Sequence, residues 1–387
     1  MKKIRKFLII MLVFVMTLTI FIGCGKNSEK VQSANKSVPA LGNLKYKSSL
    51  KLQYAKCFSV DYYEDGYILL TNGKTEKFLI VPENMKAPSG IGSDITVLKR
   101  PFTGLYVANT PSLSLINSMG ALDLVKFTGT NVKQWYVKDI VNAMKSGKLS
   151  FGGKYNTPDY ENLTAAKCNL AIESTMIESA PDVKDKLKEL GIPVLIDHSG
   201  EESHPLGRVE WVKFYAALLG VDMSKANKVF DAQVAVVDKL SKNQSTGKTA
   251  AIFYISSKGT LYVRNTDDYL TKMLGLAGGK YICDKLKNSG TNSTTMEMET
   301  FYTQAKDADY IIYIYSLGGE PKTLADLVAK NKLLADFKAV KEGNVWVTGP
   351  EFFQTADVIG NMIGDIHTML TTDDASVTKL SYLSKLQ

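Results

Sequence analysis

The chain is poor in cysteine and histidine, with four and three among its 387 residues. After Cys24, the remaining cysteines are Cys57, Cys168 and Cys283, which are widely spaced and form no C-x-x-C pair. Their odd number and spacing match neither a zinc motif nor a disulfide framework. We expect buried free thiols, because an unpaired cysteine packs like a small hydrophobic residue.

Catalytic and nucleotide-binding motifs are also missing from the sequence. It has no G-x-S-x-G elbow, no H-E-x-x-H, no phosphate-cradling P-loop and no G-x-G-x-x-G after a strand. Acid pairs such as Glu201-Glu202 are common in loops and specify no acid-base chemistry by themselves. We therefore expect a protein that is not an enzyme, and we disfavour a lipid-anchored hydrolase or an adhesin.

No hydrophobic run is long enough for a spanning helix, which needs about 20 apolar residues. The run from Phe7 to Ile22 carries no charge, follows a basic start and precedes Gly23-Cys24. This order is typical of an export signal, and Phe21-Ile22-Gly23-Cys24 resembles the bacterial lipobox. The resemblance implies a signal peptide at 1–23 and acyl chains on Cys24, which anchor a protein durably without a spanning helix. Mass spectrometry of the mature N-terminus tests this, because an unmodified Cys24 would contradict it.

The remaining composition is close to that of an average globular protein, with 45% hydrophobic and 22% charged residues. Half of the net charge of +8 comes from the basic start, and the remaining charges alternate in sign along the chain instead of forming a basic stripe, so we expect no nucleic-acid partner. A chain of this length exceeds the roughly 250 to 300 residues at which a single core stops growing. Two lobes are therefore expected. We also expect the chain to be a monomer.

The pattern after Cys24 divides into segments. Residues 24–44 are polar and form a tether. Residues 52–82 form a β-rich front segment, in which a turn at 64–66 and the pair Asn72-Gly73 separate three strands. From about residue 104, short apolar strands alternate with helical segments, which is typical of βαβ units around a parallel sheet.

This alternation occurs twice, and a helix separates the two series. Apolar residues recur at helical spacing between Ser224 and Lys242, without Gly or Pro, so a long helix is predicted at 224–246. The predicted fold class is α/β, with two Rossmann-like lobes at 45–223 and 247–387 joined by this one helix.

The segment from Tyr160 to Ile172 (YENLTAAKCNLAI) resembles a helix-to-strand element of the ABC-transporter solute-binding proteins for iron chelates, haem and vitamin B12. Similar too are Leu190 to Val194 and, in the second lobe, Met273 to Gly279 followed by Ala308 to Ile312. The order of lipobox, tether, lobe, helix and lobe also agrees with that family. The resemblance covers the chain from about Gly104 onward and implies two lobes with the ligand held between them.

The same resemblance implies a partner. Family members carry one exposed glutamate on each lobe that docks on arginines of the membrane permease, and these match Glu161 and Glu299. Glu297 competes with Glu299, because the match there needs two extra residues. The implied partners are an ABC importer permease and its ATPase, and the protein itself is expected at the outer face of the cell membrane. Glu161 also suits the first turn of a helix, where a carboxylate is stabilised by the helix dipole, with Thr157 as the cap and Pro158 at the first helical position.

Ligand contacts are expected beyond the carboxyl ends of the parallel strands. Aromatic and cationic side chains in these segments suit a bulky anionic metal chelate. The candidates are Tyr155, Arg208, Trp211, Tyr254 and Arg264, with His204 and Met176 as axial ligands to a metal centre. For Trp211 and Tyr254, core packing is the stronger interpretation, because their segments are mostly expected in the core.

Direct binding of a metal ion is the remaining alternative. His198 and His204 lie with two glutamates in a seven-residue loop, which is a composition that metal sites use. A site between two lobes needs ligands from both, and the second lobe has only His367. We therefore predict that the protein captures a metal chelate, with a ferric siderophore as the first candidate. Haem and cobalamin are the alternatives, and direct binding of Zn²⁺ or Mn²⁺ ranks below them. No resident cofactor is expected.

Overall fold

The computed structural model describes residues 41–241, 245–286, 291–319 and 321–387. The expected signal peptide, Cys24 and nearly all of the expected tether lie outside these residues. Within the described ranges, we find no helix whose length and apolar character would let it cross a membrane.

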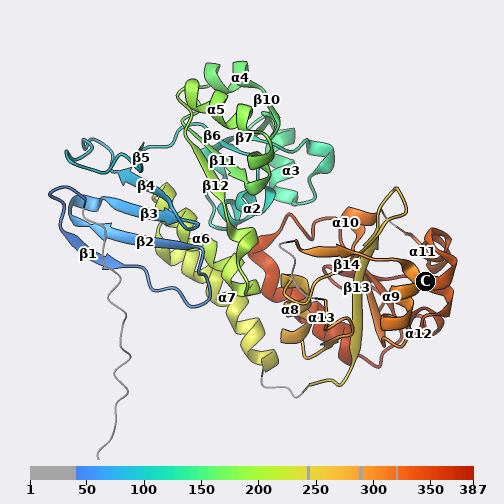
Figure 1. The fold of residues 1–387 in the computed structure, drawn as a ribbon. Coiled ribbons are helices and arrows are strands. Elements are labelled where there is room, and N and C mark those ends of the chain that lie inside the picture. Colours follow the sequence, from blue (N-terminus) through green and yellow to red (C-terminus); the bar gives the residue numbers. More distant parts are fainter. Residues whose placement is uncertain (1–40, 242–244, 287–290, 320) are drawn as a thin grey trace, which may run out of the picture. The chain divides into compact units, whose positions relative to one another are not determined.

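A five-stranded sheet, which we call the front sheet, begins the described chain (Figure 1). Its strands lie side by side in sequence order: β1 (Tyr46–Ser49), β2 (Phe58–Tyr63), β3 (Ile68–Asn72), β4 (Glu76–Val81) and β5 (Ile95–Lys99). Neighbours are antiparallel up to β4, and β5 is parallel to β4. The three expected strands are β2 to β4, but the sheet is wider than the 52–82 segment because β1 and β5 add an edge on each side.

Both faces of the front sheet are apolar. Leu70 and Ile80 join the core that contains helix α6 (Pro205–Leu219), whereas Leu69 and Leu79 join a cluster on the opposite face. Side chains alternate across a strand, so consecutive apolar residues give a sheet that is buried on both sides.

The first lobe is built on a parallel sheet with strand order β12-β11-β6-β7-β8. Its strands are β6 (Leu105–Val107), β7 (Val125–Thr128), β8 (Ser150–Phe151), β11 (Leu170–Ser174) and β12 (Val194–Asp197). Its helices are α2 (Thr110–Ser118), α3 (Lys138–Lys145), α4 (Tyr160–Ala165) and α5 (Pro181–Glu189). A short hairpin follows β8, formed by β9 (Gly153–Lys154) and β10 (Thr157–Pro158).

The second lobe has a seven-stranded sheet with order β16-β14-β13-β17-β18-β19, and β15 also pairs with β13. Its strands are β13 (Thr249–Ile255), β14 (Leu261–Arg264), β15 (Lys280–Tyr281), β16 (Ser293–Thr295), β17 (Tyr310–Tyr313), β18 (Val345–Thr348) and β19 (Leu383–Lys385). Its helices are α8 (Tyr269–Leu276), α9 (Met298–Ala305), α10 (Tyr315–Gly318), α11 (Leu324–Lys330), α12 (Lys338–Lys341) and α13 (Ile359–Thr371). Short 3-10 helices are η1 (Glu64–Gly66), η2 (Leu122–Leu124), η3 (Val132–Gln134), η4 (Thr175–Ser179), η5 (Ser199–Glu201), η6 (Lys332–Asp336) and η7 (Ala356–Val358).

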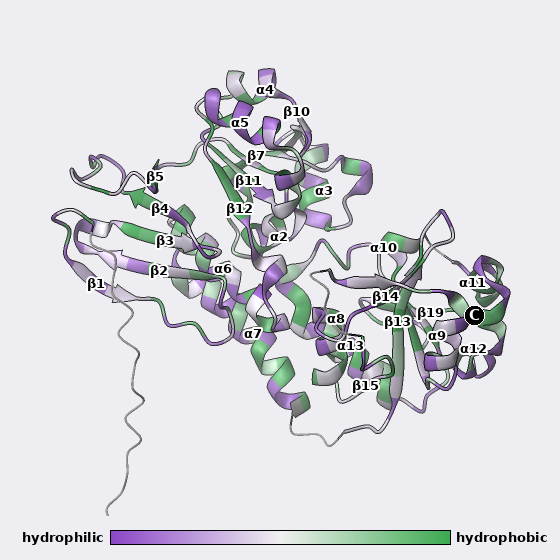
Figure 2. Ribbon diagram, in the orientation of Figure 1, coloured by the Kyte–Doolittle hydropathy of each residue, from purple (hydrophilic) through white to green (hydrophobic). Residues whose placement is uncertain are grey.

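The second sheet is mixed, not purely parallel. β14 runs antiparallel to β13 because the turn between Ile255 and Leu261 is too short for a helical crossover. The central strands β13, β17 and β18 are parallel, as expected for βαβ units. Hydrophobic residues concentrate in the central strands of both lobes, and polar residues are frequent on the outer helices (Figure 2).

The predicted helix between the lobes is confirmed as α7 (Met223–Ser241), although it ends before the expected residue 246. It packs against both α6 and α13. The contact with α13 requires a glycine, since a Cβ on Gly360 would lie 2.4 Å from the carbonyl oxygen of Gln233. The side chain of Gln233 also accepts a hydrogen bond from the backbone N–H of Asn361, at 3.1 Å.

Two buried carboxylates attach the front sheet to α6, and we call them the carboxylate clamp. Glu210 accepts the backbone N–H groups of Gln53, Tyr54 and Ala55 at 2.8 to 3.1 Å. Glu202 accepts those of the next two residues, 56 and 57, at 2.8 to 3.0 Å. Five consecutive donors before β2 therefore bind two carboxylates that are at most 3% exposed.

The clamp carboxylates also have side-chain partners. Lys213 lies 3.0 Å from Glu210 and is itself only 5% exposed. The indole N–H of Trp211 donates to Glu202 at 3.0 Å. Each buried charge is thus compensated by several hydrogen bonds, which is what its burial requires.

We expect Glu210→Gln to lower the free energy of unfolding by on the order of 3 kcal/mol, because the amide nitrogen faces backbone donors and Lys213 loses its buried partner. Urea unfolding measures the loss, and hydrogen exchange should show faster exchange at residues 53–55. Glu64→Gln is the control, since the side chain of Glu64 is 44% exposed and lies 3.9 Å from Lys45. It should change stability by less than about 0.5 kcal/mol. Equal effects of the two changes would contradict the clamp.

Candidate functional site

A pocket of about 590 Å³ opens where the carboxyl ends of the parallel strands of the two lobes meet. It is lined by Ala108, Asn109, Thr110, Gly129, Thr130, Gln134, Tyr136, Lys154, Tyr155, Ser174, Met176, Tyr315, Ser316, Gly319, Pro350 and Gln354. Nearly all of these residues follow strands β6, β7, β8, β11, β17 or β18. The strand-end rule that guided the sequence analysis therefore locates this pocket, which we call the cleft pocket.

The wall from the first lobe depends on close backbone packing. A Cβ on Gly129 would lie 2.8 Å from the Cα of Ala108, so only glycine allows β6 and β7 to end side by side here. The hydroxyl of Tyr106 donates to the carbonyl of Gly153 at 3.0 Å. This bond holds the β9–β10 hairpin, whose turn carries Tyr155 into the wall.

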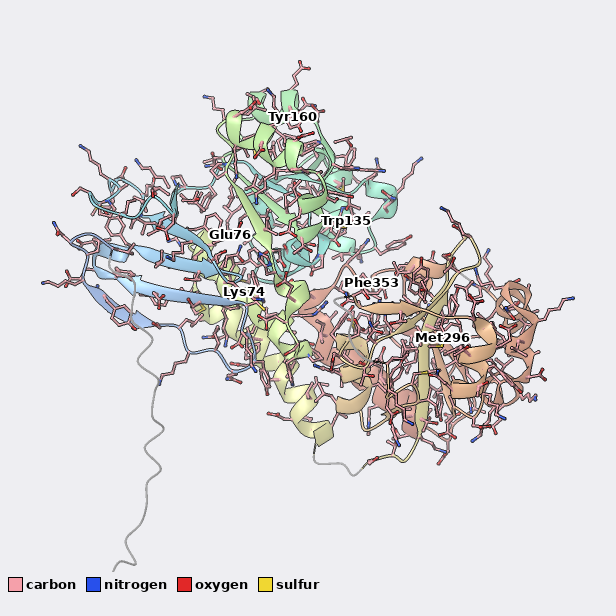
Figure 3. The ribbon with its side chains drawn as sticks, in the orientation of Figure 1. Lys74, Glu76, Trp135, Tyr160, Met296 and Phe353 are labelled. Atoms are coloured by element: carbon pink, nitrogen blue, oxygen red, sulfur yellow. The ribbon has the colours of Figure 1, made fainter. Side chains whose placement is uncertain are left out.

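The two lobes touch along one side of this pocket through Gln354. Its Nε2 donates to the carbonyl of Gln134 at 2.7 Å, and its Oε1 accepts the backbone N–H of Tyr136 at 3.0 Å. Nearby, the backbone N–H of Ala356 donates to Ser114 Oγ at 3.1 Å. The segment after β18, which also carries Phe353, thus bonds directly to the first lobe near Trp135 (Figure 3).

A buried network supports Asn109 at the base of the cleft. Asn109 Nδ2 donates to Ser112 Oγ at 2.7 Å, and Ser112 donates to Asp197 Oδ2 at 2.7 Å. Tyr215 also donates to Asp197, and the backbone N–H of Ser199 donates to Oδ1 at 2.7 Å. The donors satisfy Asp197, while burial and the Asp197 charge raise the pKa of Tyr215. Asn109 is therefore held in a fixed orientation against the pocket.

Two of the predicted ligand contacts line the cleft pocket. Tyr155 is half-buried, and Met176 is 56% exposed, which is unusual for a large apolar side chain. Tyr136, which sequence reasoning missed, is 47% exposed in the same wall. The strand-end rule did not point to Tyr136, because this residue follows a short 3-10 helix and not a strand.

The two predicted arginines lie elsewhere in the cleft. Arg208 and Arg264 line an adjoining pocket of about 760 Å³, together with Asp268, Tyr269 and Phe353 among others. A smaller cavity of about 140 Å³ lies between the two and shares Asn109 with the cleft pocket and Arg208 with the other. The structure thus brings the arginines together but not against Tyr155.

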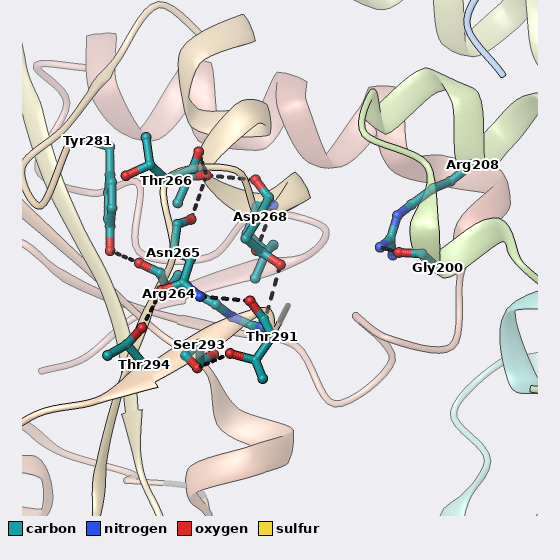
Figure 4. A network of polar contacts seen from close by, with 12 residues as sticks. Gly200, Arg208, Arg264, Asn265, Thr266, Asp268, Tyr281, Thr291, Ser293 and Thr294 are labelled. Carbon is teal, nitrogen blue, oxygen red and sulfur yellow. Dashed lines mark hydrogen bonds and ion pairs between the residues drawn. The ribbon is translucent and has the colours of Figure 1, made fainter. Parts of the chain in front are cut away.

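Each arginine already has partners within the protein (Figure 4). Arg208 donates to the carbonyl of Gly200 at 2.5 Å, and its guanidinium lies 3.6 Å from the ring centre of Tyr269 in the second lobe. Arg264 is 4% exposed and lies 3.6 Å from Asp268. Burial raises the pKa of Asp268, and the Arg264 charge opposes that rise.

Three other candidates line none of these pockets. Trp211 is completely buried and donates to Glu202, so the expectation that it contacts ligand is wrong. Tyr254 stacks on Tyr262 with ring centres 4.8 Å apart. His204 Nδ1 accepts the N–H of Leu206 at the start of α6, and the His204 ring stacks on the ring of Tyr54. One ring nitrogen and one ring face of His204 are therefore already in use.

His198 and His204 also serve separate purposes. His198 Nδ1 lies 2.9 Å from Glu201, and its ring packs 3.0 Å from where a Gly73 side chain would begin. Burial and nearby lysines lower the pKa of His204. Within the described part of the chain, no group of three or more His, Cys, Asp or Glu side chains is placed to hold a metal ion.

The expected docking glutamates are both exposed. Glu161 lies in the first turn of α4 and Glu299 in the first turn of α9. The cap of α4 differs from expectation: Asp159 is the N-cap and accepts from Asn162, because residues 157–158 are paired in β10. Glu297, the competitor of Glu299, is also exposed, at the N-cap of α9.

Glu173 is the most unusual ionisable group near the cleft. It ends strand β11 beside Ser174, is fully buried, and neither carboxyl oxygen has a hydrogen-bond partner among the described residues. Burial raises its pKa to about 8. Its charge would also raise the pKa of Tyr106 and Tyr160, which places it behind the wall that Tyr106 supports.

The fold and cleft define a two-lobed α/β binding protein, and comparisons with known proteins identify its family. The family model described as "Periplasmic binding protein" matches residues 112–352. The chain belongs to this family, whose members are solute-binding proteins and not enzymes. The front sheet precedes the matched region.

Two curated relatives are uncharacterized lipoproteins of Methanocaldococcus jannaschii. One is 28% identical, covering 93% of this chain and 94% of the relative, and the other is 26% identical, covering 94% and 93%. Among solved structures, the petrobactin-binding protein of Bacillus subtilis has a TM-score of 0.57 at 15% identity, covering 71% of this chain and 94% of that one. A periplasmic haem-binding protein of Pseudomonas aeruginosa has a TM-score of 0.57 at 15% identity, covering 74% and 98%. These likenesses show the same fold.

We expect Glu173→Gln to make the protein more stable at neutral and alkaline pH. The carboxyl ionises near its ordinary pKa of 4.5 when unfolded but near 8 when folded. Stability is therefore lost as pH rises between these values. The difference between wild type and variant should be small at pH 4.5 and grow to on the order of 2 to 4 kcal/mol at pH 8.

Urea unfolding between pH 4.5 and pH 8 measures this difference. Glu178→Gln is the matched control, because Glu178 is exposed on the following turn. A pH-independent gap between wild type and Glu173→Gln would show that the buried carboxyl is not protonated in the folded state.

Proposed function

We propose that this chain is the substrate-binding component of an ABC importer, and that it captures a metal chelate in the cleft pocket and delivers it to the permease and its ATPase. The observation that carries this proposal is a pocket of about 590 Å³ whose walls come from both lobes of a periplasmic binding protein. Such a site surrounds a ligand only when both lobes are engaged. The liganded shape can therefore be distinguished by a partner.

The lining fits a bulky ligand with polar edges. Tyr136, Tyr155 and Tyr315 offer ring faces, and Met176 offers an exposed apolar surface. Amide and hydroxyl side chains supply hydrogen bonds between these surfaces. A ferric siderophore suits this combination. The second candidate is haem or cobalamin in the same pocket. The side chains of Met176 and Tyr155 favour it, because both can serve as axial ligands to iron or cobalt.

The proposed location is the outer face of the cell membrane, with Cys24 as the lipid anchor. The signal-like segment at 1–23 and the lipobox-like residues support it. The polar sequence that follows Cys24 is the predicted tether between this anchor and the lobes.

Addition of the correct chelate should raise the unfolding free energy. A ligand at about 100 times its dissociation constant adds ~2.7 kcal/mol, which a thermal shift detects. We expect Tyr155→Ala to weaken binding by about tenfold, equivalent to ~1.4 kcal/mol. Phe151→Ala is the control, because Phe151 is 40% exposed in β8 but does not line the cleft pocket. No stabilisation by ferric siderophores, haem or corrinoids would reject the proposed function.

The exposed glutamates of α4 and α9 are the proposed docking points, since an arginine of a partner binds an exposed carboxylate with two hydrogen bonds. Glu161→Ala and Glu299→Ala should each reduce chelate uptake by cells at least several-fold while leaving the dissociation constant unchanged. Glu189→Ala and Glu342→Ala, which alter exposed glutamates elsewhere on the two lobes, are the controls. Normal uptake by the double variant would refute docking, and a silent Glu299→Ala alone would favour Glu297.

A further inference from the structure

The cleft pocket carries very little charge. Of the described residues that line it, Lys154 is the one with a charged side chain, and none is acidic. Seven others are uncharged polar residues, and three are tyrosines. Lys330 comes near the rim, where its Nζ lies 3.9 Å from the Cβ position of Gly319, but it already interacts with another residue.

The rest of the cleft supplies no surplus of positive charge. Arg208, Arg264 and Lys272 line the two adjoining cavities, which also contain six carboxylates. Those acids are Glu178, Asp197, Glu201, Glu202, Asp267 and Asp268. A ligand with several negative charges would therefore enter a cleft whose acidic groups outnumber its cations, and it would be partly desolvated there.

The two arginines are not free to reverse this balance. The Arg264 guanidinium faces Asp268 and is almost fully buried, and the Arg208 guanidinium lies on the Tyr269 ring. Each keeps one buried N–H, at Nε, without a hydrogen-bond partner among the described residues. Single N–H donors of this kind suit the neutral oxygen of a ligand or a water. On Arg208, whose Nη2 already donates to Gly200, the remaining Nε–H cannot complete the fork that binds a carboxylate or catecholate, and the charge of Arg264 is already opposed by Asp268.

We infer that the ligand is a metal chelate with little or no net charge, held by hydrogen bonds and aromatic contacts. This inference rests on the proposed function and narrows its substrate class. A ferric ion bound by three singly charged hydroxamates is neutral, whereas one bound by three doubly charged catecholates is strongly anionic. The hydroxamate complex matches a pocket of amides, hydroxyls and tyrosines. A corrinoid is a second class of metal chelate with little net charge that such a pocket can bind by hydrogen bonds.

The test uses four probes: ferrichrome as the neutral ferric hydroxamate, ferric enterobactin as the anionic catecholate, haem, and cyanocobalamin. Trp135 is the reporter, because its indole N–H donates to the carbonyl of the pocket residue Thr130 at 3.1 Å. We expect ferrichrome or cyanocobalamin to bind at least tenfold more tightly than the catecholate, and the comparison between these two identifies the source. The neutral probe's dissociation constant should change less than about twofold between low and high salt, because screening acts on charges.

Three variants test the charge argument directly. Lys154→Met should weaken binding of the catecholate more than binding of the neutral chelate, and Lys148→Met, at an exposed position outside the pocket, is its control. Thr130→Lys adds a cation to the wall and should strengthen catecholate binding several-fold without strengthening the neutral chelate.

The outcomes are separable. Tighter binding of the catecholate or of haem, weakened steeply by salt and abolished by Lys154→Met, would overturn the inference and leave the proposed function standing. If none of the four probes binds, both fail.

Discussion

The carboxylate clamp, with Glu210 in helix α6 and Glu202 just before it, is the contact on which the arrangement of the described chain depends. Glu202 and Glu210 lie in the interior, where an unpaired charge is strongly destabilising. They are tolerated because five consecutive backbone N–H groups of residues 53–57 converge on them. Those donors would in turn be orphaned without the carboxylates. Neither the front sheet nor α6 is therefore complete without the other.

Helix α6 transmits this constraint to the cleft. It is buried along almost its whole length and packs against the front sheet, α2, α7 and α13. The interlobe helix α7 packs against both α6 and α13, and Gly360 allows α13 to approach it closely. Any opening or closing of the lobes must occur against these fixed contacts and the two hydrogen bonds of Gln354. Such packing favours a limited motion over a wide hinge.

The electrostatics of the cleft follow from where its charges are already used. Asp197 receives donors from Ser112, Tyr215 and Ser199, and the arginines have partners in the protein. Glu173 is buried without a hydrogen-bond partner among the described residues, and burial raises its pKa to about 8, which favours its neutral form. What remains facing the cleft pocket is mainly hydrogen-bonding capacity and aromatic surface. Recognition there is consequently expected to depend on shape and polar contacts more than on charge.

Much of the fold was determined by local sequence patterns. The alternation of apolar strands with helices predicted both lobes, and the spacing in 224–242 predicted α7, because periodicity is a property of neighbouring residues. The strand-end rule likewise led to Tyr155 and Met176. The second sheet was expected to be parallel, and the short turn before β14 made it mixed.

The tertiary structure decided which polar and aromatic side chains remain available to a ligand. Trp211 and Arg264 have suitable chemistry, but their partners Glu202 and Asp268 were not recognisable as such from the sequence. Gln354 contacts residues more than 200 positions earlier, and Glu210 binds residues more than 150 positions earlier. Burial and pairing of this kind depend on how distant segments pack together. The sequence therefore determined where the cleft lies, and only the folded chain determined how little charge it offers.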